Sequence, residues 1–300
     1  MDVARTPDDR FDGLPGWDHE PRYLEWEGLR LARAEAGPDD GDTVVLLHGE
    51  PTWGYLYRRV IPPLVDAGLR AVAPDLPGFG RSDKPTDGEW YQYDRLSEAL
   101  DAQLGAPGLE DPFTLVVHDW GGLLGLVWAV EHPDRVSRLV ICNTGLYVPG
   151  GKMSEAWMDF RDFVERADEL PVGFLVDGAC ATDLDDEVKA AYEAPFHEPT
   201  AHAGALALPL RVPLNDDDEG AQRQWEANQA LTSWETPTLV AWGADDPILP
   251  VKVGRRWADT IPGSVGIEEL SPAGHFLQED AGEELGELVA RFARGQYTSS

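Results

Sequence analysis

Basic residues are scarce in this chain of 300 residues, and lysine is the scarcest of the charged types. The sequence has 24 Lys and Arg against 55 Asp and Glu, which gives a formal net charge of -31. Nucleic acids and anionic membranes attract proteins through clustered positive charge, so this balance argues against both as partners. The acidic residues are scattered along the chain, and we interpret most of them as solvated surface charge.

Cysteine and long apolar runs are also scarce. Cys142 and Cys180 lie far apart without CxxC spacing, so we expect two buried, inert thiols and no metal or redox site. The sequence has no run of about 18 apolar residues and no signal-like start, so nothing in it indicates a membrane or secretory protein. We therefore expect a cytoplasmic protein. With neither a clustered His/Cys ligand set nor a dinucleotide glycine motif, we expect no metal and no organic cofactor.

The acidic, lysine-poor composition also indicates a salt-rich setting. In molar salt the Debye length falls to about 3 Å, so the mutual repulsion of acidic surface groups is screened. We therefore expect a halophilic source.

Short apolar runs alternate with helix-length segments. Unbroken apolar runs are typical of strands covered on both faces, and their alternation with helices predicts an α/β fold with a parallel, doubly wound sheet. The expected strands are 44–47, 71–73, 113–117, 139–142, 238–242 and 265–270, after an antiparallel pair within 22–36. The expected helices include 55–67, 96–104, 121–131 and 251–260.

The alternation stops after Cys142. Residues 143–213 read as helices and loops without a buried strand, which predicts an inserted helical cap. The sheet-bearing core would then consist of residues 1–142 and 214–300.

The segment FTLVVHDWGGLLG, residues 113–125, has the pattern of a strand that turns at once into a helix. In α/β hydrolases this is the nucleophile elbow, and its nucleophile position holds Asp119 here. A carboxylate needs no base to displace a leaving group from an sp³ carbon, and the product is an alkyl ester that water must cleave. The alternative is that Asp119 only caps the following helix.

Two later segments supply an acid and a base. Asp246 follows an expected strand, and His275 lies in a loop after the next one, which is the α/β-hydrolase order. His275 would activate water against the ester, and Asp246 would orient its imidazole. Asp245 is the competitor for the acid role.

Backbone N–H groups of Glu50 and Trp120 are expected to form the oxyanion hole, because ester hydrolysis places negative charge on a carboxyl oxygen of Asp119. The Glu50 side chain either positions the hydrolytic water or is paired near the site. We interpret the nearby His48, His118 and Pro51 as turn-forming or supporting residues.

Five segments together resemble the haloalkane dehalogenases, in the branch with Glu after His-Gly: HGEPTW, DLPGFGRSDKP, VVHDWGG, GADDPIL and AGHFLQED. The resemblance runs from the N-terminal arm through Ala281 and includes YEAPF at 192–196. It implies an α/β-hydrolase with a cap that converts a haloalkane and water to an alcohol, a halide ion and a proton. The family pattern places the acid directly before proline, which favours Asp246, and it implies that the Trp120 indole binds the halide.

A second halide donor is expected from a Trp early in the cap, and here the chain departs from the family. An alignment through residues 170–173 places Phe160, which has no N–H, at that position. Trp157 lies three residues earlier, on the same face of an expected helix. We predict that Trp157 substitutes, the alternative being an aromatic that only packs the cap.

Other functions remain open at this stage. An epoxide hydrolase shares the Asp nucleophile but needs proton donors in the cap, for which Tyr147 and Tyr192 are candidates. A non-catalytic ligand-binding protein on a hydrolase scaffold is the third reading, although such proteins usually lose a triad residue. The sequence does not determine the preferred haloalkane or the oligomeric state.

Overall fold

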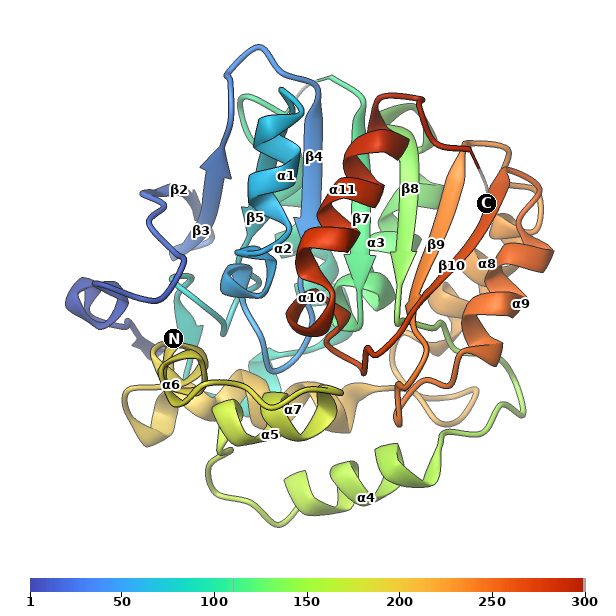
Figure 1. Ribbon diagram of the computed structural model, residues 1–300. Helices are drawn as coiled ribbons and strands as arrows, with labels where there is room; N and C mark the ends of the chain where they lie inside the picture. Colours follow the sequence, from blue (N-terminus) through green and yellow to red (C-terminus); the bar gives the residue numbers. More distant parts are fainter. Residues whose placement is uncertain (110, 299–300) are drawn as a thin grey trace.

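An eight-stranded sheet organises the computed structural model, which describes residues 1–109 and 111–298 (Figure 1). The strand order is β10-β9-β8-β7-β4-β5-β3-β2. Neighbouring strands from β5 to β10 run parallel, while β3 pairs antiparallel with both β5 and β2. The strands are β2 Pro21–Trp26, β3 Leu29–Ala36, β4 Thr43–Leu47, β5 Arg70–Pro74, β7 Phe113–His118, β8 Val136–Cys142, β9 Thr238–Gly243 and β10 Ser264–Leu270. A separate two-stranded sheet pairs β1 Val3–Ala4 with β6 Lys84–Pro85.

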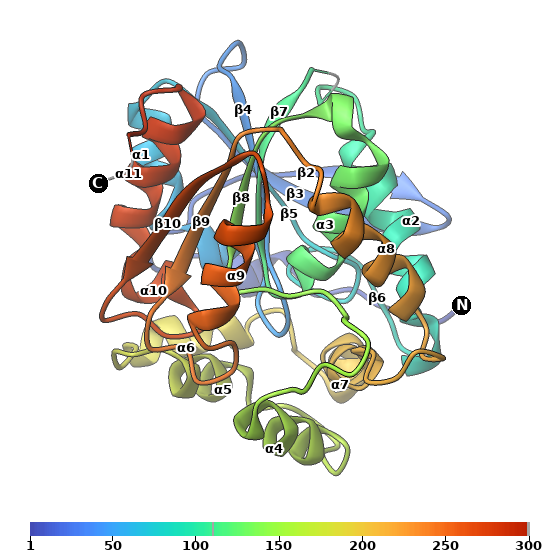
Figure 2. The ribbon, with the colours of Figure 1, turned by 90° about the vertical axis from the view of Figure 1, so that its right-hand side faces the viewer.

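Helices cover both faces of the large sheet, as the view along its edge shows (Figure 2). The pair α1 Ile61–Asp66 and α11 Gly282–Ala293 packs on one face, and α2 Tyr93–Leu104, α3 Trp120–Glu131 and α8 Ala221–Leu231 pack on the other. Helix α9 Lys252–Thr260 packs on β9 and β10, and the short α10 Leu277–Asp280 precedes α11. Every residue of β5, β7 and β9 is buried, as expected for central strands covered on both sides.

The sequence predicted this architecture closely, with one error among the helices. All predicted strands are confirmed, including the antiparallel pair at 22–36. The predicted helix at 55–67 is wrong: a 3-10 turn at Gly54–Tyr57 is followed by the short α1. Pro62 and Pro63 have no N–H to donate to carbonyls four residues earlier, so an α-helix cannot run through them and begins there instead.

Four helices form a layer at the carboxyl ends of the parallel strands (Figure 1). They are α4 Glu155–Val164, α5 Val172–Ala179, α6 Asp186–Glu193 and α7 Ala203–Arg211, and all lie within residues 143–213. We infer that this layer is the cap. Among the helices of the described residues, none has the length and apolar character needed to cross a membrane.

The two cysteines occupy different environments. Cys142 ends β8 and is buried, and burial raises its pKa. Cys180 follows α5 and is only partly buried, so the expectation of two buried thiols is wrong for this residue.

Candidate active site

The turn between β7 and α3 holds Asp119 in a conformation that side chains rarely adopt. Its φ is 48° and its ψ is -122°, and this strained turn lifts the carboxylate above the sheet edge. Glycines allow the close packing: a Cβ on Gly121 would lie 2.5 Å from the Leu47 carbonyl oxygen, and one on Gly122 would lie 2.0 Å from the Thr144 hydroxyl. Glycine is equally required at Gly49, where a Cβ would lie 2.2 Å from an Asp119 carboxylate oxygen.

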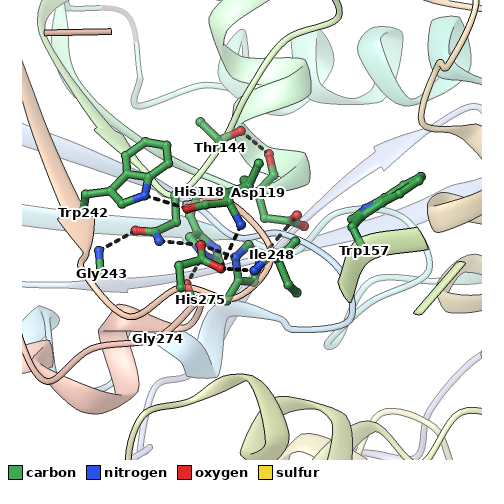
Figure 3. Close-up of polar contacts among 12 residues, drawn as sticks. His118, Asp119, Thr144, Trp157, Trp242, Gly243, Ile248, Gly274 and His275 are labelled. Atoms are coloured by element: carbon green, nitrogen blue, oxygen red, sulfur yellow. Dashed lines mark hydrogen bonds and ion pairs between the residues drawn. The ribbon is translucent and has the colours of Figure 1, made fainter. Parts of the chain in front are cut away.

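The structure brings Asp119, Asp246 and His275 together from three separate segments (Figure 3). His275 Nδ1 bonds Asp246 Oδ2 at 2.9 Å, and His275 Nε2 lies 3.6 Å from Asp119 Oδ2. The imidazole is almost completely buried, with 2% of its residue exposed. It therefore lies between two carboxylates with one nitrogen directed at each.

Asp246, and not Asp245, is the acid that contacts the imidazole. Its Oδ1 accepts hydrogen bonds from the main-chain N–H groups of Ile248 at 2.7 Å and Leu249 at 2.9 Å, which fixes the carboxylate. Asp245 is exposed and accepts instead from the Ser271 hydroxyl at 3.2 Å.

Asn143 is a site residue that the sequence reasoning missed. Its amide donates to Asp246 Oδ2 at 2.6 Å, and its Oδ1 accepts from the Gly243 N–H at 2.8 Å. The signal was its position directly after β8, because the carboxyl ends of parallel strands meet at the edge of the sheet where ligands bind. Its φ of 29° is again one that favours glycine, so a second strained residue lies beside the elbow.

The pKa values of the acidic groups at the site are shifted in opposite directions. Burial opposes charge on His275, but Asp246 and Asp119 outweigh it and raise the pKa of the imidazole to about 10. Burial also opposes charge on Asp119 and Asp246, yet contact with His275 holds the pKa of each carboxyl below its usual range. Burial and the neighbouring Asp119 raise the pKa of Glu50 well above normal. The arrangement therefore favours an ionised Asp119 beside a charged imidazole and opposes negative charge on Glu50.

The two expected oxyanion donors both act on Asp119. The Glu50 main-chain N–H donates to Asp119 Oδ1 at 2.8 Å, and the Trp120 main-chain N–H also bonds this carboxylate and lowers its pKa. The Glu50 side chain is buried, and its Oε1 has no hydrogen-bond partner among the described residues. The two neighbouring histidines bond the main chain: His48 Nε2 accepts from Leu76 at 3.0 Å, and His118 Nε2 lies 2.9 Å from the His275 carbonyl oxygen.

The loop that carries His275 is attached to the cap. The His275 N–H donates to the Ala179 carbonyl at the end of α5, at 2.8 Å. Asp280 joins the same two parts: its Oδ2 accepts from both Gly274 and the cap residue Ala181 at 2.8 Å, and its Oδ1 accepts from Thr182 at 2.9 Å. A Cβ on Gly274 would lie 2.3 Å from the Ala179 oxygen, so this contact also requires glycine. The cap therefore helps to fix the position of the imidazole.

A cavity of about 780 Å³ lies between the sheet edge and the cap, with Asp119, Trp120 and His275 in its wall. Trp157 and Phe160, both from α4, also line it. Trp157 is nearly buried, and Figure 3 shows its ring set apart from Asp119 and extending away from it. Among the described residues no cluster of His, Cys, Asp or Glu is arranged to hold a metal ion.

The two cap tyrosines differ in their access to the cavity. Tyr147 lines it, but its hydroxyl donates to Asp216 at 2.6 Å. Tyr192 is buried, is not among the lining residues, and donates its hydroxyl to Glu279.

Comparison with known proteins places the chain within a family. Residues 42–175 match the family model of the alpha/beta hydrolase fold. A haloalkane dehalogenase of Mycobacterium marinum is 42% identical over 96% of this chain and 99% of its own length. The solved structure of a haloalkane dehalogenase from Paraglaciecola agarilytica NO2, described as tetrameric, has a TM-score of 0.90 and 34% identity, covering 100% of both chains. A cis-3-alkyl-4-alkyloxetan-2-one decarboxylase of Xanthomonas campestris is less similar, at 31% identity over 93% of this chain and 97% of its own. The chain belongs to the haloalkane dehalogenase family of the α/β hydrolases.

Proposed function

We propose that this protein hydrolyses the carbon–halogen bond of haloalkanes in two steps, with Asp119 as the covalent nucleophile. The observation that carries the proposal is the carboxylate at the elbow, whose Oδ1 accepts from the Glu50 main-chain N–H, whose Oδ2 faces His275, and whose pKa is held below its usual range. Such a carboxylate suits displacement at an sp³ carbon, because it attacks without first losing a proton.

In the first step a carboxylate oxygen of Asp119 forms a bond to the carbon that bears the halogen. The carbon–halogen bond breaks, and the halide leaves with the electron pair. A halide needs hydrogen-bond donors and no proton, which an indole N–H supplies. Trp120, next to Asp119 in the cavity wall, is our first donor. We retain Trp157 as the second donor, a role that requires its ring to turn from the orientation in Figure 3 towards Asp119.

In the second step water cleaves the ester of Asp119. In the ester, where Asp119 is neutral and no longer holds a proton on the imidazole, His275 takes a proton from the water as the water oxygen attacks the carboxyl carbon of Asp119. The bond between that carbon and the alkyl oxygen then breaks, and the imidazole passes its proton to the departing oxygen to give the alcohol. The regenerated carboxyl group of Asp119 releases the remaining proton. Negative charge then develops on a carboxyl oxygen of Asp119, the group to which the main-chain N–H groups of Glu50 and Trp120 donate in the free protein. Asp246, fixed by Asn143 and two main-chain donors, stabilises the imidazolium that forms.

The alternatives predict different geometry or different products. An epoxide leaves as an alkoxide and needs a proton donor in the cavity, whereas Tyr192 is directed at Glu279 and the Tyr147 hydroxyl is bonded to Asp216. A non-catalytic binding protein has no need of a nucleophile, base and acid in bonding contact, and this site has all three.

One experiment separates these functions. Purified protein is mixed in turn with 1,2-dibromoethane, styrene oxide and a 3,4-dialkyl oxetan-2-one, and bromide, diol and alkene are followed. We expect bromide and acid from the first substrate only. Asp119→Ala should retain the far-ultraviolet circular dichroism of the wild type and release no bromide, because the elbow carboxylate points into the cavity. Full bromide release by a folded Asp119→Ala protein would disprove the nucleophile assignment.

A further inference from the structure

Three cationic residues line the active-site cavity where it meets solvent: Lys152, Lys252 and Arg256. All three are exposed, whereas of the reacting groups His275 is buried and Asp119 is partly buried. Lining residues that are exposed to solvent mark the opening of a cavity. We call Lys152, Lys252 and Arg256 the cationic rim.

The cationic rim is opposite in charge to the chain as a whole. Asp and Glu make up 55 of the 300 residues, and only four are lysines, yet two of those lysines are in the rim. Among the described residues that line the cavity, the acids are Asp119 and Glu50, and both belong to the reacting site. Asp216, which accepts a hydrogen bond from the Tyr147 hydroxyl at 2.6 Å, and the neighbouring Asp217 and Asp218 lie near the lining but are not part of it. The charged side chains among the exposed lining residues are therefore all cationic, on a strongly negative protein.

Helix α9 carries two of these charges at a cost to its own stability. Lys252 is its first residue and Arg256 lies four residues later, so two like charges are neighbours on one face. A positive charge at a helix N-terminus also opposes the helix dipole, and the first turn contains no acid. Within the described part of the chain neither side chain has an acidic partner, whereas the adjacent Arg255 pairs with Glu269 at 2.6 Å. The stability of α9 therefore does not explain why Lys252 and Arg256 are cationic.

Lys152 reaches the same opening from the other side. It lies in the segment between β8 and α4, three residues before α4 begins. Ser154, two residues after Lys152, donates its hydroxyl to the Ile248 carbonyl at 2.8 Å, four residues before Lys252. This bond holds the two cationic segments together at the mouth.

Resting on the proposed dehalogenase function, we propose that the cationic rim selects substrates with an anionic far end, namely ω-haloalkanoates. The cavity lining also includes apolar groups such as Leu146, Leu175 and Val253, which suit a methylene chain. A carboxylate is costly to bury without partners, so it stays at the rim while the halogen end reaches Asp119. The reaction then converts an ω-haloalkanoate and water to an ω-hydroxyalkanoate, a halide ion and a proton.

The test compares charged and neutral substrates of equal length. Bromide release is measured for a series of ω-bromoalkanoates and for the matching ω-bromoalkanamides, at the lowest KCl concentration at which the far-ultraviolet circular dichroism is native. The wild type is compared with the triple variant Lys152→Gln/Lys252→Gln/Arg256→Gln. Arg166→Gln is the control, because Arg166 is an exposed cap cation outside the cavity lining.

We expect the triple variant to lose about tenfold in kcat/KM for the bromoalkanoates, the low end of the range for charge steering, with the amides unchanged. The loss should shrink as KCl is raised, because salt screens exposed charges. Arg166→Gln should match the wild type. The double variant Lys252→Glu/Arg256→Glu should reduce the bromoalkanoate rate further.

Several results would overturn the inference. The first is a wild type that converts the bromoalkanamides but not the bromoalkanoates. The second is a ratio of kcat/KM for bromoalkanoate to kcat/KM for bromoalkanamide that is equal in the wild type and the triple variant. The third is an equal loss of kcat/KM for both substrates in the triple variant. Weaker bromide inhibition with an unchanged ratio would show that the rim acts on the halide product instead. If the wild type releases bromide from neither substrate nor from 1,2-dibromoethane, the failure lies in the proposed function itself.

Discussion

Esterification of Asp119 should sharply weaken the proton affinity of His275. The ester is neutral, so its formation removes one of the two carboxylates that hold a proton on the imidazole. His275 Nε2 and Asp119 Oδ2 are 3.6 Å apart, and at an effective dielectric of about 20 two unit charges at this distance interact by about 4 to 5 kcal/mol. That energy corresponds to a factor on the order of 10³ in proton affinity. The pKa of His275, about 10 in the free protein, should then fall into the neutral range.

The variant Asp119→Asn reproduces this change, because the amide has the shape of the carboxylate without its charge. The pKa of His275 is followed through the imidazole Cε1 proton by NMR in the wild type and in Asp119→Asn. Asp245→Asn is the control, since Asp245 is exposed and bonds Ser271 rather than the ring. We expect a large fall in Asp119→Asn and a nearly unchanged value in Asp245→Asn. A pKa that stays near 10 in Asp119→Asn would refute the reasoning.

The same effect sets the pH dependence of the two half-reactions. Asp119 has a lowered pKa and stays ionised well into the acid range, so alkylation should continue there. Below the pKa of His275 in the ester, the imidazole holds a proton and cannot accept one from water. Hydrolysis should therefore slow and the ester accumulate as the pH falls, which single-turnover bromide release and intact-mass spectrometry measure separately.

The remaining predictions concern the base, the charge and the halide. His275→Gln should release about one bromide per site and then stall with alkylated Asp119, and an unmodified mass after the burst would contradict this order of steps. The melting temperature should rise along a KCl series, because the Debye length shrinks from about 30 Å at 0.01 M to about 3 Å at 1 M, and a flat series would remove the case for a halophilic protein. Trp120→Phe should weaken bromide binding, measured by fluorescence quenching, by about 1–3 kcal/mol. Trp157→Phe should do the same if its indole is the second donor, and an unchanged affinity would exclude it.

Local patterns predicted the sheet and the order of the site residues. The elbow follows from a strand that ends directly before Asp119, with Gly121 and Gly122 after Trp120. The carboxyl ends of β9 and β10 place Asp246 and His275 at the same edge. Asn143 could have been found by the same rule, because it follows β8 directly. Pro62 and Pro63 could also have shown that no continuous α-helix spans residues 55–67.

Contacts between distant segments were beyond the reach of these patterns. Nothing in the cap sequence indicates that Ala179 accepts a hydrogen bond from His275, or that Asp280 joins both segments. The orientation of the Trp157 ring could not be predicted either. Helical periodicity shows on which face of the helix a side chain lies, but it does not show how that helix lies over the cavity. The cationic rim was hidden for the same reason, since Lys152 and Lys252 are far apart in sequence.

The hydrogen bond from His275 to Ala179 has a consequence for how such enzymes can be rearranged. A cap is commonly regarded as an exchangeable module that changes substrate range while the core retains the chemistry. Here His275, the proposed base, takes its backbone position partly from the cap, and Asp280 binds the cap and the loop that carries His275 with a single carboxylate. In a chimaera between relatives, the end of α5 and the loop through Asp280 should therefore be transferred from the same parent, because recombination between them would separate the imidazole from its support.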